Sequence, residues 1–189
     1  FPARRSSDLM DNLRWEAVHI EEWRGKDLNY TTGRILALTK EWNVDRAIID
    51  SDGYGAGNLD MIIHGQRKNN FQGFNNPTLS EEKDKDFGNP RTHFAFKLRD
   101  LVLKKYICIS DDLLINELCT LRYKFLNDGR RILVSKNEMR KEGIPSPNRA
   151  DCAIMICSLL DDVRDEQNRQ YVSQPTDYGA KWNAFEGIR

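Results

Sequence analysis

The sequence has no excess of charge of either sign and no long apolar run. Its 29 basic and 29 acidic residues cancel over 189 residues, so no overall basic field points to a nucleic-acid partner. No apolar run approaches the ~18 residues that a membrane-spanning helix requires, and no signal peptide is visible. We therefore expect no membrane partner, and any binding of a polyanion would depend on local clusters of basic residues.

Cysteine and histidine are also scarce. The three histidines lie far apart, and none is paired with a Ser or Cys nucleophile in a known motif, so acyl-transfer chemistry has no support. The four cysteines form no Cys-x-x-Cys pair, which argues against a zinc site or a disulfide framework. We interpret them as small core residues in a reducing compartment. They are Cys108, Cys119, Cys152 and Cys157.

A length of 189 residues suits one domain with a substantial core. Periodicity predicts helices over 30–42, 58–67, 92–105, 136–141 and 146–163. Strands are predicted over 13–24, 47–49 and 71–74, and a solvated loop over 75–89. Residues 121–125 suit either the end of a helix or one strand of a hairpin, because Asn-Asp-Gly at 127–129 is a strong turn signal. The pattern predicts an α/β fold.

The central stretch is an apolar run at 47–49 that ends on Asp50 and is followed by Gly53, Gly55 and Gly57. Ligands of open α/β sheets gather at the carboxyl ends of strands, where Asp50 is expected to lie. The glycine spacing differs from the dinucleotide fingerprint, and no Lys-Ser or Lys-Thr follows to form a P-loop. A tight turn with positive φ is the simpler explanation of the glycines. A nucleotide-binding domain is the weakest of three alternatives.

A second aspartate, Asp151, is expected in the first turn of an apolar helix. Ser146 and Pro147 suit an N-cap followed by proline at the first helical position, and the helix dipole favours an ionised Asp151. Mg²⁺ prefers a few carboxylates plus waters, and two-metal phosphodiester hydrolysis requires converging hard oxygen ligands. Asp50 and Asp151 suit that role. Spacing alone also suits two structural roles. Asp50 would accept hydrogen bonds from the amides of its own glycine loop, and Asp151 would complement the positive end of its helix.

Basic residues follow the expected hairpin turn. A hairpin with basic edges beside the Asp151 helix would suit contacts with the phosphates of DNA. A solvated face is the commoner meaning of such a cluster. The residues are Arg130, Arg131, Lys136, Arg140 and Lys141.

From residue 13 to residue 160 the sequence resembles the nuclease domain of tailed-phage large terminase subunits. The resemblance implies an RNase H-like mixed sheet flanked by helices. It also implies an activity that cuts concatemeric double-stranded viral DNA during genome packaging. The matching phrases, in order, are EEWRGKD at 21–27, AIIDSDGYGAGNLDMI at 47–62, INELCTLRYKF at 115–125, GRRILVSKNEMRKEG at 129–143 and SPNRADCAIMIC at 146–157.

The resemblance further implies a site of three acidic residues around Mg²⁺ or Mn²⁺, in which Asp50 is the second acid and Asp151 the third. Lys136 would lie near this site on the family's hairpin. The implied partners are double-stranded viral DNA, the portal and the small terminase subunit, in the cytoplasm of an infected bacterial host. Further DNA contacts are expected from Arg130, Arg131 and Lys141.

The sequence departs from the family's pattern at its beginning. Residues 1–9, FPARRSSDL, resemble the translation of a sequencing adapter, and no counterpart of the family's first aspartate is present. We expect a non-native leader at 1–9, a truncated RNase H-like domain at 10–163 that lacks its first two strands, and a polar tail at 164–189. Such a chain would be inactive and poorly stable, because a central strand and a metal ligand are missing. The alternative is a non-catalytic RNase H-like module that binds DNA or docks on the portal.

Overall fold

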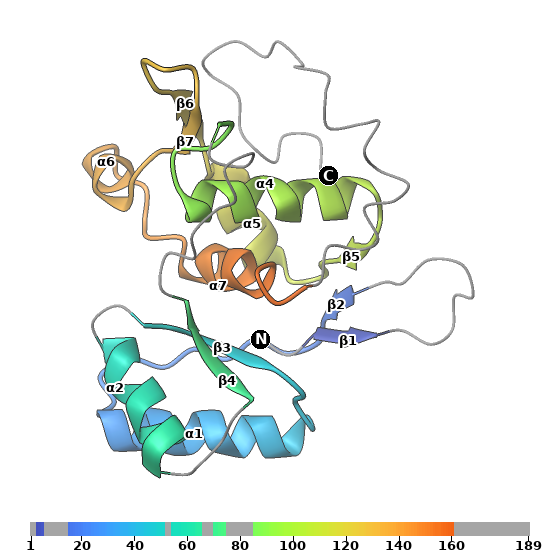
Figure 1. Cartoon of the computed structure of the whole chain (residues 1–189), viewed down its shortest axis with the longest axis vertical. Helices are drawn as coiled ribbons and strands as arrows, with labels where there is room; N and C mark the ends of the chain where they lie inside the picture. The colour runs from blue at the N-terminus through green and yellow to red at the C-terminus, as the bar shows by residue number, and fades with distance from the viewer. Residues whose placement is uncertain (1–2, 6–14, 52–53, 66–69, 75–84, 161–189) are drawn as a thin grey trace.

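A computed structural model describes residues 3–5, 15–51, 54–65, 70–74 and 85–160. The predicted tail at 164–189 lies outside the described residues, as do most of the loop predicted over 75–89 and six residues of the predicted leader. The described elements form two groups that meet near the middle of the molecule (Figure 1). None of the helices in these ranges is long and apolar enough to cross a membrane.

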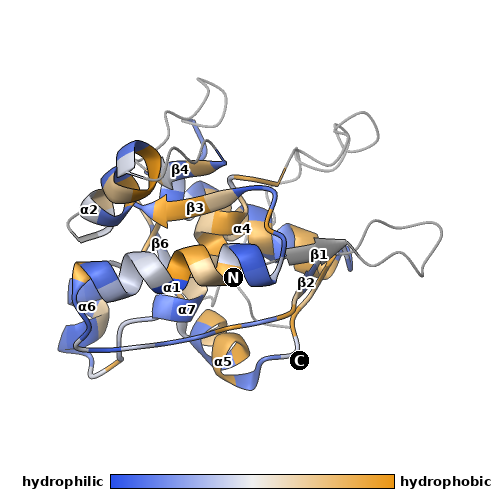
Figure 2. Ribbon diagram, turned by 90° about the horizontal axis from the view of Figure 1, so that it is seen from below, coloured by the Kyte–Doolittle hydropathy of each residue, from blue (hydrophilic) through white to orange (hydrophobic). Residues whose placement is uncertain are grey.

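The first group contains two α-helices, a π-helical turn and two strands. These are α1 (Leu28–Glu41), β3 (Ala47–Asp50), α2 (Tyr54–Asp60), η1 (Met61–Gly65) and β4 (Phe71–Phe74). The two strands pair in parallel, with Ala47 opposite Phe71, and β3 is apolar along most of its length (Figure 2). Helix α2 packs on both strands and α1 packs on α2. A hydrogen bond of 2.9 Å from the hydroxyl of Thr32 to Asn58 Oδ1 joins the two helices inside the protein.

The second group contains four helices, a short strand and a hairpin. The predicted turn at 127–129 forms: β6 and β7 pair antiparallel across it, and the helix before it ends at Thr120. Helix α7 contacts both α4 and α5 on one side and β3 of the first group on the other, as Figure 1 shows. The elements are α4 (Pro90–Leu103), β5 (Ile107–Cys108), α5 (Asp112–Thr120), β6 (Tyr123–Phe125), β7 (Arg131–Leu133), α6 (Lys136–Lys141) and α7 (Asn148–Ile156).

The N-terminal strands differ from the sequence-based expectation. The strand predicted over 13–24 is confined, among the described residues, to β2 (Trp15–Ala17). It pairs in parallel with β5 and antiparallel with β1 (Ala3–Arg5), which lies within the range 1–9 that was left out of the fold prediction. The described strands therefore form three small sheets, of three, two and two strands.

The start of α7 also corrects the prediction. Ser146 does not cap the helix; its hydroxyl lies 3.1 Å from Asn148 Oδ1, and Pro147 occupies the cap position without a side-chain hydrogen bond. The amide of Ala150 instead donates to a carboxylate oxygen of Glu117 on α5, at 3.0 Å. A long-range contact therefore replaces the local cap and fixes α7 against α5.

The core lies where α4, α5 and α7 meet. Leu98, Leu114 and Ile154 are at most 2% exposed there. Cys157 is fully buried in the same core, and burial raises the pKa of its thiol to about 12. The prediction that all four cysteines are core residues is wrong, because the other three are exposed or only partly buried. These are Cys108, Cys119 and Cys152.

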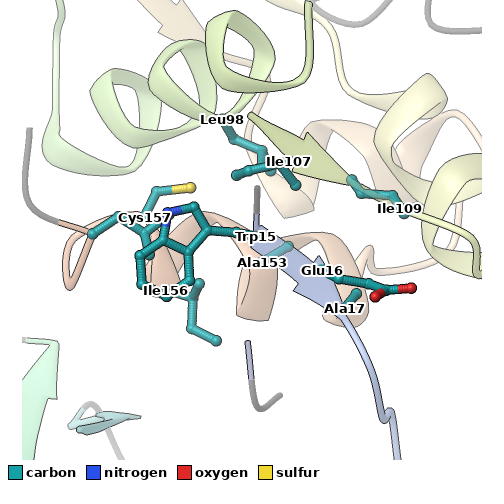
Figure 3. Close-up of a pocket in the computed structure, with 10 residues that line it drawn as sticks. Trp15, Glu16, Ala17, Leu98, Ile107, Ile109, Ala153, Ile156 and Cys157 are labelled. Carbon is teal, nitrogen blue, oxygen red and sulfur yellow. The ribbon is translucent and has the colours of Figure 1, made fainter. Parts of the chain in front are cut away.

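A cavity of about 20 Å³ lies between β2, β5, α4 and α7. Its lining is apolar apart from Glu16, whose carboxylate points away from it (Figure 3). The indole of Trp15 lies beside Cys157 and Ile156 in the same view. A space of this size with apolar walls is a packing defect and not a ligand site.

Helix α5 offers a direct test of the core, because neighbouring leucines differ fully in burial. Leu114 is 0% exposed and Leu113 is 57% exposed. We expect Leu114→Ala to lower the free energy of unfolding by about 2–5 kcal/mol, since it leaves a cavity. Leu113→Ala, the matched control, should change it by less than ~0.5 kcal/mol. Urea denaturation followed by circular dichroism measures both, and equal losses would contradict the described packing.

Candidate metal centre

Asp50 is the last residue of β3 and its side chain is exposed there. The following helix approaches the strand so closely that a Cβ atom on Gly55 would overlap the carbonyl oxygen of Asp50. A Cβ on Gly57 would likewise lie 3.2 Å from Leu28 of α1. Both glycines belong to α2 and neither has positive φ, so the predicted tight turn is wrong for them. Gly53 lies outside the described residues.

Asp151 lies in the first turn of α7, and its side chain is only 14% exposed. Two cations hold it. Nε and Nη2 of Arg91, from α4, each lie 2.8 Å from Oδ1, and Nζ of Lys136, from α6, lies 2.7 Å from Oδ2. The Lys136 contact is an ion pair without hydrogen-bond geometry. Oδ2 is therefore buried without a hydrogen-bond partner among the described residues.

The structure brings the elements that carry Asp50 and Asp151 into contact, since β3 packs against α7. The charges of both carboxylates act on the thiol of Cys152, which lies next to Asp151 in the sequence. Burial is the largest cause that raises the pKa of this thiol, the charges of Asp151 and Asp50 raise it further, and Lys136 opposes them. Part of Cys152 is open to solvent, but protein atoms crowd around its sulfur.

The two carboxylates fit part of a donor set for a divalent cation. The buried Oδ2 of Asp151, which accepts no hydrogen bond from the described residues, and the exposed carboxylate of Asp50 are hard oxygen donors of the kind that Mg²⁺ and Mn²⁺ bind. No group of three or more Asp, Glu, His or Cys side chains within the described ranges is arranged to hold a metal.

Two of the predicted DNA contacts are already engaged by other residues of the protein. Nε of Arg130 lies 2.8 Å from Asp128 Oδ2 in the turn. The guanidinium of Arg131 stacks on two aromatic rings, at 4.5 Å from the ring centre of Phe87 and 4.8 Å from that of Phe96. These contacts neutralise or cover both arginines, so the hairpin offers less free positive charge than its sequence indicates.

The short helix α6 presents the remaining predicted contacts. It starts with a reciprocal capping box, in which Ser135 Oγ accepts from the Glu138 amide and Glu138 Oε2 accepts from the Ser135 amide. Lys124 of the hairpin pairs with the same glutamate at 2.5 Å, so the pKa of Glu138 falls to about 2, with Lys124 as the largest cause and Ser135 next. Lys141 is exposed at the end of this helix and makes no ion pair with any described residue.

Sequence reasoning missed Arg91, one of the two cations that contact Asp151. A signal for it does exist. Asn89 and Pro90 mark a helix start, which places Arg91 in the first turn, where the helix dipole disfavours a cation. A basic residue in that position indicates a carboxylate partner from another part of the chain.

Comparisons with known proteins support the fold. No protein-family model and no curated protein matches the sequence. Among solved structures, the nuclease domain of the large terminase subunit gp2 of bacterial virus Sf6 is similar, at 25% identity and a TM-score of 0.59 over 75% of this chain and 76% of that one. A lysine-to-alanine mutant of that domain with manganese gives 23% identity and a TM-score of 0.61, over 75% and 78%.

A third similar structure is the same mutant with calcium, at 24% identity and a TM-score of 0.63 over 75% of this chain and 77% of that one. At these identities the likeness establishes the fold. It confirms the predicted resemblance to a phage terminase nuclease domain and the RNase H-like α/β class. The divalent metals belong to the Sf6 protein and leave the roles of Asp50 and Asp151 as predictions.

The contact between α2 and β3 predicts a severe effect of a single methyl group. Gly55→Ala would push a Cβ atom into the Asp50 carbonyl, and we expect it to lower the free energy of unfolding by about 1–3 kcal/mol. Gly33→Ala in α1 is the matched control, because nothing lies within 4 Å of its Cβ position. It should stabilise by about 0.5–1 kcal/mol through helix propensity. Urea unfolding distinguishes the two, and a neutral Gly55→Ala would contradict the close approach.

The capping box of α6 predicts a pH dependence. The pKa of Glu138 is lowered from 4.5 to about 2, so its stabilising contribution is present above pH 4.5 and is lost as the pH falls toward 2. We expect Glu138→Gln to melt below the parent protein at pH 7 and to approach it as the pH falls through this window. Thermal melts in matched buffers measure the gap. A gap that stays constant between pH 7 and pH 3 would contradict the assignment.

Proposed function

We propose that this chain belongs to a metal-dependent nuclease domain of the kind found in phage DNA-packaging terminases. The intact protein would cut concatemeric double-stranded DNA with Mg²⁺ or Mn²⁺, whereas the 189-residue chain itself would be inactive. The observation that carries the proposal is the contact between β3, which ends on Asp50, and α7, whose first turn carries Asp151. The likeness in fold to a terminase nuclease domain supports it. Carboxylates at element ends that converge from distant parts of a chain are the expected ligands for this chemistry.

Each residue of the site has a proposed role. Asp50 and Asp151 would hold the divalent cation, which when bound supplies charge stabilisation for the transition state and activates water. Lys136 lies against Asp151, so it is placed to meet a phosphate near the ion. Lys141 is exposed on the same helix. The remaining proposed phosphate contacts, whose present partners would have to be exchanged, are Arg130 and Arg131.

The biological setting follows from the same proposal. The DNA substrate would be viral, the portal and the small terminase subunit would be protein partners, and the site of action would be the cytoplasm of the infected bacterium. The likeness to the Sf6 large terminase subunit supports this setting.

A non-catalytic RNase H-like module is the second candidate. Two observations favour it: no group of three or more Asp, Glu, His or Cys side chains in the described part of the chain is arranged to hold a metal, and Asp151 is already paired with Arg91 and Lys136. Such a module would bind DNA or the portal and would not need a divalent metal.

The two aspartates test the proposal. Asp50→Asn and Asp151→Asn remove an anionic ligand with little change in shape. We expect each to abolish Mn²⁺-dependent cleavage of supercoiled plasmid by the protein with its full natural sequence. Each should also weaken calorimetric Mn²⁺ binding by the 189-residue chain by about tenfold or more. The matched control is Asp60→Asn, which removes a carboxylate that is 74% exposed on α2.

The outcomes separate the two candidates. Loss of cleavage in both site variants with normal activity in the control supports the nuclease. Cleavage retained by either Asp50→Asn or Asp151→Asn would refute the assigned site. DNA binding that is unchanged by a chelator, with no cleavage by the parent protein, would establish the non-catalytic module.

A further inference from the structure

Arg91 contacts Asp151 in an unusual way. An arginine usually meets a carboxylate with two parallel hydrogen bonds, one to each oxygen. Here both Nε and Nη2 lie 2.8 Å from the same oxygen, Oδ1. Oδ2, the other oxygen, is buried and has no hydrogen bond among the described residues. The guanidinium thus occupies one face of the carboxylate and leaves the other for a cation.

We propose that Arg91 is a positioning residue that fixes the rotation of the Asp151 carboxylate, so that Oδ2 is the oxygen offered to a divalent cation. The metal part of this inference rests on the proposed function. The orientation of the carboxylate does not, because it is a property of the metal-free protein. Arg91 itself would not touch the ion or the substrate.

The backbone that carries Arg91 is firmly held. Asn89 Oδ1 accepts hydrogen bonds of 2.8 Å from both the amide and the hydroxyl of Thr92. The same hydroxyl oxygen accepts one of 3.0 Å from the amide of Leu133 on β7. Thr92 is 0% exposed. The first turn of α4 is therefore fixed to the hairpin. The backbone of Arg91 is held in place, and its side chain extends from there to α7.

Stability alone explains the position of Arg91 poorly. A cation in the first turn of a helix opposes the helix dipole. Its Nη2 atom is buried and makes the ion pair without hydrogen-bond geometry, and an unsatisfied buried donor is costly. A residue that served only to neutralise Asp151 would do so at lower cost from the C-terminal end of a helix. Holding one carboxylate oxygen in place accounts for these costs.

Lys136 differs from Arg91 in each respect that matters for exchange. Its side chain is 44% exposed, against 24% for Arg91, and it lies on the short helix α6 without hydrogen-bond geometry to Oδ2. A cation that arrives at Oδ2 would displace Lys136 and leave Arg91 where it is. Arg91 therefore orients the carboxylate, and Lys136 is the partner that an incoming metal ion would replace.

The test uses a variant that keeps the charge and loses the planar fork. We expect Arg91→Lys to weaken Mn²⁺ binding by the 189-residue chain about tenfold in calorimetry, as for other residues that orient a metal ligand. The matched control is Arg34→Lys, because Arg34 also contacts a carboxylate through Nε and Nη2, at 2.8 and 2.7 Å, but on α1 with Glu21. It should bind Mn²⁺ like the parent protein. Arg91→Ala should weaken binding at least as much as Arg91→Lys.

Two results would overturn the inference. Parent-like affinity in Arg91→Lys would mean that the fork has no positioning role. Tighter binding by Arg91→Ala would mean that Arg91 acts only as a competing charge. Thermal melts of both lysine variants control for folding. If Arg91→Lys keeps the melting temperature of the parent protein, its weaker Mn²⁺ binding is a loss of metal affinity and not a loss of folded protein.

A metal-free readout keeps the inference testable if the parent chain binds no Mn²⁺, a result that would count against the proposed nuclease alone. We expect the crystal structure of Arg91→Lys to show the Asp151 carboxylate rotated, with Oδ2 no longer free of hydrogen bonds. A carboxylate that keeps its orientation in that variant would refute the positioning role whatever the metal result.

Discussion

The carboxylate of Asp151 is the charge around which three helices are arranged. It is 14% exposed and is neutralised by Arg91 from α4 and Lys136 from α6. A carboxylate with so little solvent requires such partners, because removing one from a nearly buried ion pair leaves an uncompensated charge. The contact that fixes α4 to the hairpin also holds the turn that carries Arg91, and the contact of α7 with α5 holds the turn that carries Asp151. The packing of the second group of elements therefore also determines the positions of the residues at the site.

The hairpin shows how a basic stretch of sequence can carry little free charge. Arg122 pairs with Glu142, Lys124 with Glu138 and Arg130 with Asp128. Exposed pairs of this kind are weak individually and are screened by salt, so a polyanion would compete with the acids for these cations. Contacts with DNA at this surface would be exchanges of partner, which gives a weaker interaction than free cations would.

Local features were predictable from the sequence, and long-range contacts were not. The Asn-Asp-Gly turn gave the hairpin, and apolar periodicity placed α1 and α4 within two residues at each end. The cap of α7 was wrong because Glu117, which is 33 positions away, supplies the hydrogen bond. Arg91 was missed for the same reason, since 60 positions separate it from Asp151. The α2 glycines were misassigned because close packing, not positive φ, requires them. Spacing alone left Asp50 and Asp151 undecided, and only the family resemblance singled them out as metal ligands.

The burial of Cys157 gives α7 a chemical reporter of its own movement. Thiol reagents react with the thiolate, and a thiol whose pKa is raised to about 12 by burial supplies almost none at neutral pH. Cys108 is exposed and offers a site for labelling in the folded state. Modification of Cys157 requires the end of α7 to leave the core, so its labelling rate measures the opening of the helix that carries Asp151. The chain can thus report, without any introduced cysteine, how often the C-terminal end of this helix leaves the core.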